Sequence, residues 1–198
     1  MGRTGRPREF DRDAALEAAM LAFWRKGYTS TSLSELCEAM QIGSPSLYAA
    51  FGSKEGLYLE ALGRYMQTHG PLIWGKLLAA PAARIGVERF MQAAAVHLPA
   101  NGSDPPGCMA TIAVADDFPP AVVERLRAFR LQCLQMLRGK IGDGVGSGEL
   151  PASTDVEYLS RFYLSIYQGM SIQALDGAGT TELERVIPFA MAAWPVQG

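Results

Sequence analysis

The side chains of this sequence that could do covalent or metal chemistry do not have the spacings that such chemistry needs. No His-Glu-x-x-His and no Cys-x-x-Cys pattern occurs in the 198 residues, so the ligand sets of common metal sites are missing. The glycine-rich run 142–148 matches neither the dinucleotide-binding nor the phosphate-loop pattern. Asp116 and Asp117 form an adjacent acidic pair, which we interpret as the end of a helix and not as a catalytic pair. The sequence thus predicts no cofactor and no metal, and an all-helical enzyme is the least favoured alternative.

Three cysteines, Cys37, Cys108 and Cys133, predict a protein of a reducing compartment, because an odd number at irregular spacing does not suit a disulfide framework. Cys108 lies near a predicted helix start, where a thiol can become sensitive to oxidation. Regulation through this thiol, or by a protein partner, is an alternative to sensing of a small molecule. No signal peptide opens the chain, and no uncharged run reaches the roughly 18 residues of a membrane span. We therefore expect a cytoplasmic protein with no membrane partner.

Serine and threonine side chains, whose hydroxyl groups can form hydrogen bonds with a binding partner, are concentrated between residues 29 and 54. Ser32 and Glu35 have the spacing of a capping box, followed by apolar residues at helical spacing up to Met40. The run 41–43 interrupts this pattern. A second short helix is predicted over 44–51, with Ser44 as a cap and Pro45 in the first helical position.

Two helices this short need a third helix behind them, and the sequence supplies one over residues 12–26. Its apolar residues recur at helical spacing, and Gly27 is placed to end it. Three helices in this order form a helix-turn-helix unit, whose second short helix enters the major groove of DNA.

The sequence resembles the tetracycline-repressor (TetR) family over residues 12–62, in the run from Phe23-Trp-Arg-Lys-Gly-Tyr-Thr-Ser-Thr-Ser-Leu33 through Ser46-Leu-Tyr-Ala-Ala-Phe-Gly-Ser-Lys54. The resemblance implies an all-α fold. A three-helix helix-turn-helix DNA-binding domain with an N-terminal arm would span residues 1–53, and a larger helical ligand-binding and dimerisation domain would span 54–198. It also implies a sequence-specific transcriptional regulator, a repressor that a small molecule releases from its operator. The chain departs from the family at Gln41, where glycine is usual, and its second short helix carries no charged or amide side chain.

Contacts to a palindromic, double-stranded operator are expected from eight residues. The resemblance implies that Tyr48 and Lys54 contact phosphates, and Thr31 and Ser32 could do so from a helix N-terminus. The predicted base contacts, through hydroxyl groups or against thymine methyls, are Ser44, Pro45, Ser46 and Ala49. For some of these residues the alternative role is only to cap and space the helix. With a net charge of −2 the chain shows no general basic character, but Arg3, Arg6 and Arg8 could follow a DNA groove.

An uncharged stretch over residues 162–175 predicts a helix that is covered on more than one side. One stripe, including Tyr163 and Met170, should face the core of the same chain. The predicted dimer interface is the other stripe, together with one residue of the last helix (181–194): Phe162, Ser165, Gly169, Ile172 and Phe189. Two such helices from each subunit would form a two-fold homodimer, which the resemblance also implies. A helix at the centre of a monomer is the alternative.

The resemblance further implies an effector pocket in the C-terminal part. Its candidate lining residues are methionine, aromatic and other apolar side chains, which favour a largely hydrophobic ligand. They are Met66, Trp74, Met91, Met109, Ile112, Phe129, Cys133, Met136, Tyr163 and Tyr167. The alternative for each of them is a place in the core.

Overall fold

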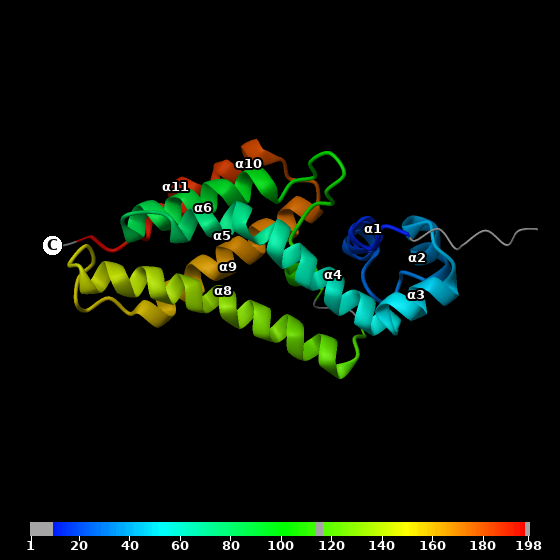
Figure 1. The fold of residues 1–198 in the computed structure, drawn as a ribbon. Helices are drawn as coiled ribbons and strands as arrows, with labels where there is room; N and C mark the ends of the chain where they lie inside the picture. Colours follow the sequence, from blue (N-terminus) through cyan, green and yellow to red (C-terminus); the bar gives the residue numbers. More distant parts are fainter. Residues whose placement is uncertain (1–9, 114–116, 197–198) are drawn as a thin grey trace, which may run out of the picture.

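The computed structural model describes residues 10–113 and 117–196, and in these ranges the chain is built from helices without a β-strand. The predicted all-α fold is therefore confirmed. Figure 1 shows α1 to α3 at one end of the molecule, α4 running away from them, and the remaining helices packed together at the other end. The helices are α1 (Arg12–Lys26), α2 (Leu33–Met40), α3 (Ser44–Phe51), α4 (Lys54–Thr68), α5 (Gly70–Leu78), α6 (Ala83–His97), α7 (Met109–Ile112), α8 (Pro120–Gly146), α9 (Val156–Leu175), α10 (Thr180–Glu184) and α11 (Val186–Ala192).

The ends of α1 and α2 are set by residues close to them in the sequence. Asp11 caps α1 by accepting hydrogen bonds from the N–H groups of Asp13 and Ala14, and Gly27 ends it with φ 80°. The capping box of Ser32 and Glu35 is present at the start of α2. Apolar side chains from the first three helices, all shielded from solvent, then form one core with the inner side of α4.

Gln41 adopts the left-handed conformation that its place in the turn requires, with φ 54° and ψ 39°. Its N–H group closes α2 by donating to the carbonyls of Cys37 and Glu38. A side chain in this conformation brings Cβ close to the following carbonyl oxygen, which costs about 1–2 kcal/mol. The turn between α2 and α3 is therefore strained at one residue.

Gln41→Gly should raise the free energy of unfolding by about 0.5–1 kcal/mol, because glycine relieves this strain but is also freer in the unfolded chain. Urea unfolding followed by circular dichroism measures the change. Glu38→Gly is the matched control, since glycine inside α2 should lower stability by about 1 kcal/mol. A Gln41→Gly protein that is no more stable than the parent would show that the turn carries no such strain.

Glu35 also makes the helix-turn-helix unit sensitive to acid. Its carboxylate accepts hydrogen bonds from the ammonium group of Lys26 and from the backbone N–H and hydroxyl of Ser32. These contacts, that with Lys26 first, lower the pKa of Glu35 from 4.5 to about 2. A lowered pKa stabilises the fold above pH 4.5, and this contribution is lost as the pH falls towards 2.

We expect Glu35→Gln to flatten the fall in thermal stability between pH 4.5 and about 2, because the variant has no carboxylate to protonate. The midpoint of thermal unfolding, measured across this range, tests the prediction. Glu38→Gln is the control, since Glu38 is exposed on the same helix and makes no ion pair within the described residues. If Glu35→Gln and Glu38→Gln follow the parental profile equally, Glu35 does not carry the acid sensitivity.

In the C-terminal part, two predicted boundaries are wrong. The glycine-rich run 142–151 predicts a linker, but α8 continues through it to Gly146. Gly144 is needed there because a Cβ atom would lie 2.6 Å from the Cβ of Ala83 on α6. The predicted last helix is divided into α10 and α11, because Pro188 cannot donate to the carbonyl one turn earlier.

Candidate nucleic-acid interface

The second short helix, α3, presents one face to solvent and buries the other. Leu47 and Phe51 point into the core. The predicted base-contacting residues and the predicted phosphate contact on this helix are all exposed: Ser44, Pro45, Ser46, Tyr48 and Ala49. A turn of three residues joins α3 to α2, as in a helix-turn-helix unit that places this face in a major groove. The contacts of these five residues with DNA stay predictions.

Ser44 does not cap α3 as predicted. Gly43 is the N-cap and makes no side-chain bond, while Ser44 is the first helical residue, with Pro45 next to it in the first turn. The Ser44 hydroxyl lies 3.6 Å from the sulfur of Cys37 and remains at the surface. This hydroxyl is therefore available for a contact outside the chain, since the helix does not need it as a cap.

Thr31 and Ser32, which were both predicted to contact a phosphate, differ in how exposed their side chains are. The side chain of Thr31 is 0 % exposed, and its hydroxyl donates to the carbonyl of Gly27 at 2.6 Å. A phosphate contact through the Thr31 hydroxyl does not fit this conformation, because the hydroxyl ties the end of α1 to the start of α2. A contact through its backbone N–H stays a prediction. Ser32 is exposed, and it shares its hydroxyl with Glu35 in the capping box.

Lys54 is the first residue of α4, and its side chain has a fixed direction. The ammonium nitrogen lies 4.5 Å from the centre of the Tyr28 ring, within the range of a cation–π interaction. Tyr28 in turn packs against Tyr58 and Phe118, with ring centres 5.3 and 5.7 Å away. The lysine proposed to contact phosphate is thus supported by aromatic rings from α4 and from the segment before α8. The predicted arginine contacts of the N-terminal arm (Arg3, Arg6 and Arg8) lie outside the described residues, as does Asp116.

The ten predicted effector contacts are mostly core residues. Trp74 packs against Phe90 and Tyr167, with ring centres 4.5 and 5.3 Å away, so these side chains touch one another directly. Met109 and Ile112 line a separate cavity of about 270 Å³, next to Trp24 and Tyr58. Most of the ten residues therefore belong to the core, where aromatic rings pack closely against one another. Their contact with an effector stays a prediction.

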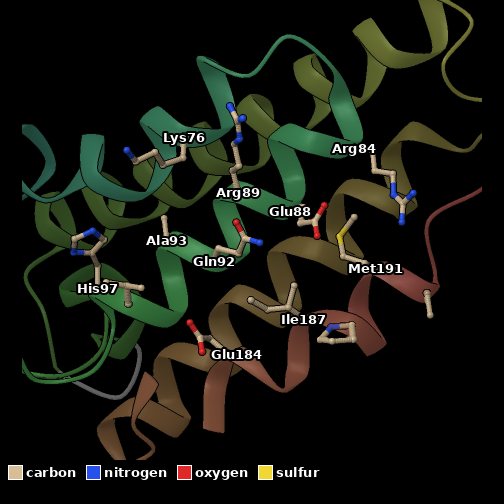
Figure 2. Close-up of a pocket in the computed structure, with 13 residues that line it drawn as sticks. Lys76, Arg84, Glu88, Arg89, Gln92, Ala93, His97, Glu184, Ile187 and Met191 are labelled. Atoms are coloured by element: carbon tan, nitrogen blue, oxygen red, sulfur yellow. The ribbon is translucent and has the colours of Figure 1, made fainter. Parts of the chain in front are cut away.

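A cavity of about 990 Å³ lies elsewhere, between the outward face of α6 and the helices α10 and α11 (Figure 2). None of the residues predicted to contact an effector lines this cavity. Arg84, Glu88 and Gln92, spaced by four residues, could have marked a polar face of α6, but no sequence pattern shows that α11 lies opposite that face.

The stripe predicted as a dimer interface is at the surface of the chain. Phe162 is 39 %, Ile172 40 % and Phe189 82 % exposed, and Ser165 is exposed beside them. Apart from the adjacent residues and the nearby backbone of α9 itself, no atom of the described residues lies within 4 Å of the position of a Cβ at Gly169. The opposite stripe is buried, with Tyr163 donating its hydroxyl to the carbonyl of Ala190. A large exposed apolar face of this kind marks an interaction surface.

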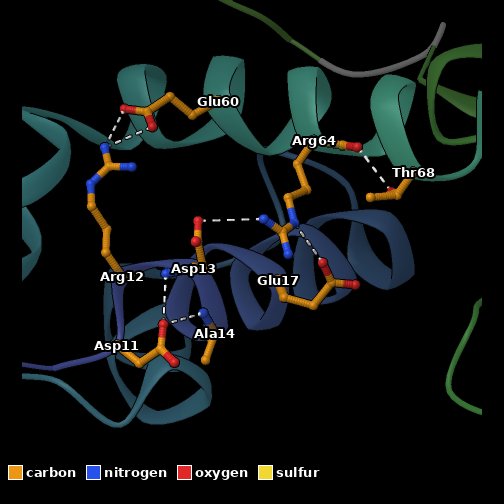
Figure 3. A network of polar contacts seen from close by, with 8 residues as sticks. All are labelled: Asp11, Arg12, Asp13, Ala14, Glu17, Glu60, Arg64 and Thr68. Atoms are coloured by element: carbon orange, nitrogen blue, oxygen red, sulfur yellow. Dashed lines mark hydrogen bonds and ion pairs between the residues drawn. The ribbon is translucent and has the colours of Figure 1, made fainter.

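Ion pairs tie α1 to α4, the helix that leads into the C-terminal part (Figure 3). Arg12 donates to both carboxylate oxygens of Glu60, at 2.9 and 2.7 Å, and also to the carbonyl of Ala50 on α3. Arg64 donates to Glu17 at 2.8 Å. Exposed pairs contribute little stability each, but several together fix the direction of one helix relative to another. A shift of α4 would therefore move α1 and α3 with it.

A second connection runs through the loop before α7. The indole N–H of Trp24 donates to the carbonyl of Gly107 at 3.1 Å, and Arg25 donates to the carbonyl of Ser103. The N–H group of Cys108, the residue after Gly107, donates to the hydroxyl of Ser171 on α9 at 2.8 Å. The loop thus joins α1 to the centre of the C-terminal domain.

Cys108 is 1 % and Cys133 is 3 % exposed, whereas Cys37 is half-buried. Burial is the larger cause that raises the pKa of the Cys133 thiol well above its usual range, and the electrostatic effect of Cys108 is the next. A raised pKa keeps the thiol protonated and unreactive. Oxidation of Cys108 or Cys133 would therefore require the domain to open locally.

A thiol-reactive dye should consequently label Cys37 first in the native protein, and Cys108 and Cys133 after unfolding in denaturant. Mass spectrometry of digested samples taken over time identifies the order of labelling. Cys37→Ser should remove the fast phase. Rapid labelling of Cys108 in the native protein would contradict the protected environment described above and would favour regulation by oxidation.

No helix in the described ranges combines the length and the apolar character that crossing a membrane would take. Within the same ranges, no three side chains of the His, Cys, Asp and Glu types are grouped so as to hold a metal ion.

Comparison with known proteins agrees with this architecture in both halves of the chain. Residues 15–61 match the family described as bacterial regulatory proteins, tetR family, and residues 86–187 match the tetracyclin repressor-like C-terminal domain. The HTH-type transcriptional repressor ComR of Escherichia coli (strain K12) is 32 % identical over 193 residues, which cover 96 % of this chain and 92 % of that protein.

Solved structures give the same result. A cysteine mutant of the TetR family regulator CifR, complexed with 26-bp double-strand operator DNA, superposes with a TM-score of 0.90 at 41 % identity, covering 96 % of this chain and all of that one. A TetR family regulator from Cytophaga hutchinsonii, 20 % identical with a TM-score of 0.80 over 94 % of this chain and 96 % of that one, shares the fold. The chain therefore belongs to the TetR family of bacterial regulatory proteins and is a helix-turn-helix transcriptional regulator.

Proposed function

We propose that this regulator is a homodimeric repressor that leaves its operator when a small, largely hydrophobic effector binds to the C-terminal domain. The observation that carries the proposal is the exposed face of α3, which is held by a buried core and offers hydroxyl and methyl groups where a major groove would lie. Ser32, Tyr48 and Lys54 would position this face on phosphates, and Ser44, Pro45, Ser46 and Ala49 would contact bases. Its relative ComR is named a repressor, and CifR is complexed with operator DNA.

A two-fold dimer through α9 and α11 would place two such faces on a palindromic operator. We propose Phe162, Ser165, Gly169, Ile172 and Phe189 as part of that interface. The DNA-binding domain of residues 1–53 and the ligand-binding and dimerisation domain of residues 54–198 would then meet at the start of α4. Because bacterial operators lie in the cytoplasm, we place the protein there.

Effector release would act through α4. An effector bound among the C-terminal helices would shift α4, and the ion pairs of Arg12 and Arg64 would carry α1 and α3 along, changing the spacing of the two α3 helices. Thermodynamic linkage then requires that the operator complex binds the effector more weakly than the free protein does, by the same factor.

Two measurements test the proposal. The purified protein, incubated with sheared genomic DNA, should retain fragments that share a palindromic sequence, and retention of random fragments would contradict a sequence-specific regulator. Mass spectrometry of the natively purified protein should identify a bound small molecule, whose affinity is then measured with and without operator. Equal affinity in both states would rule out release by that ligand.

A further inference from the structure

A groove with both apolar and charged walls runs along the outward face of α6. We call it the α6 groove; it is the cavity of about 990 Å³ between α6 and the pair α10–α11, with Lys76 of α5 at its edge (Figure 2). Its lining along α6 extends from Arg84 to His97, which is about 20 Å at 1.5 Å per residue. The groove is thus long enough for an extended chain molecule.

Apolar side chains of α11 and of the adjacent part of α6 line one wall of the groove. Ile187 and Met191 of α11 are 6 % and 7 % exposed, and Ala93 of α6 is 8 % exposed, so their remaining accessible surface is small. Val96, also lining the groove, is 46 % exposed. A bound alkyl chain would take this exposed surface out of water, which contributes about 25 cal/mol per Å².

Positive charge lies on the opposite wall. Lys76 and Arg89 extend on the same side of the groove in Figure 2, and Arg84 lies at one end. Within the described residues, none of the three forms an ion pair. The acidic residues of the lining are placed differently: Glu88 lies one turn from Arg84 on α6, and Glu184 is across the groove on α10. The wall at Lys76 and Arg89 therefore favours an anion.

The apolar wall and the positively charged wall of the groove each argue against a simpler ligand. A neutral hydrocarbon would cover the apolar wall but leave Lys76 and Arg89 without a counter-charge. A small inorganic anion would neutralise the cations but leave the apolar wall in contact with water. A ligand with one negative group and a long apolar chain satisfies both walls, and charge-assisted hydrogen bonds to a carboxylate are stronger than neutral ones.

We propose that the α6 groove binds an amphipathic carboxylate, with its head group at Lys76 and Arg89 and its alkyl chain along Val96, Pro188 and Ala192, which are the exposed apolar residues of the lining. The inference deepens the proposed function and rests on it in one respect, namely that such a ligand would be the effector. The structure supplies a route for that effect. Pro188 lines the groove, and the next residue, Phe189, is 82 % exposed on the predicted dimer face, so a ligand that displaces α11 would alter the dimer.

Isothermal titration calorimetry of the full chain with dodecanoate, dodecanol and acetate tests the site directly. Dodecanoate should bind at least about tenfold more tightly than dodecanol, because two charge-assisted bonds are added, and acetate should give no measurable binding. The double variant Lys76→Gln/Arg89→Gln should bind dodecanoate about tenfold more weakly and dodecanol as before. Val96→Glu, which places a charge on the exposed part of the apolar wall, should weaken both.

Arg125→Gln is the matched control, since Arg125 is an exposed arginine of α8 outside the groove, and it should bind dodecanoate like the parent. Circular dichroism verifies that each variant is folded. Equal binding of dodecanoate and dodecanol, or unchanged binding by the double variant, would overturn the site. If dodecanoate binds as expected but leaves operator affinity unchanged, the site stands and its role as the effector site is overturned. If no operator is ever retained, the proposed function fails independently of the groove.

Discussion

Gly169→Arg should convert the proposed dimer into monomers and weaken operator binding by about 10²–10⁴-fold. The loss follows because a dimer holds two half-sites at once, and this bivalency supplies affinity without any additional contact. Beyond the nearby backbone of α9, nothing in the described part of the chain lies within 4 Å of a Cβ at position 169, so the arginine can be accommodated in the protomer. Arginine also favours a helix more than glycine, so α9 should remain folded. The charge would instead enter the predicted contact with the second copy, beside Phe162 and Ile172.

Sedimentation velocity measures the assembly, and a binding titration on operator DNA measures the affinity. Gly139→Arg is the matched control: position 139 is also a helical glycine with open space around it, but it is on α8. The control should stay dimeric and bind the operator like the parent. A dimer that persists in Gly169→Arg would show that α9 does not form the interface, and the bivalent arrangement would then need another contact.

The second large effect is expected from Lys54→Ala, which should weaken binding to operator and to scrambled DNA alike. A lysine on a phosphate releases a counterion, so its removal should lower the salt slope by roughly one unit per contact, or two per dimer. Its place at the start of α4, directed by the Tyr28 ring, supports a role in positioning and not in reading sequence. A salt titration on both DNAs tests this.

Base-facing residues should behave in the opposite way. Replacing Ser44 or Ala49 should change the preferred base in each half-site, by about 1–3 kcal/mol per contact, and leave the salt slope nearly unchanged. If Lys54→Ala spares binding to scrambled DNA, or if the Ser44 and Ala49 variants keep the parental preference, the proposed orientation of α3 is wrong. Because α3 carries no charged or amide side chain, we expect the arginines of the N-terminal arm to read groove shape in addition.

Local signals in the sequence determined the DNA-binding end of this protein. Capping residues, a glycine after α1, a proline in the first turn of α3 and apolar residues at helical spacing each act over a few residues. The bounds of α1 and α3 were therefore predictable. The uncharged stretch of α9 likewise predicted one buried and one exposed stripe, because amphipathic spacing is also a local property.

Tertiary structure decided whatever depends on residues far apart in the chain. Thr31 was predicted to contact a phosphate, yet its hydroxyl donates to the carbonyl of Gly27. The aromatic residues proposed for an effector pocket fill the core, because Trp74, Phe90 and Tyr167 come from three helices whose packing no local pattern specifies. The α6 groove exists because α10 and α11 lie against a polar face of α6 about a hundred residues earlier in the chain. Composition and spacing can predict which face of a helix is polar, but which helix lies opposite that face depends on the packing of the whole domain.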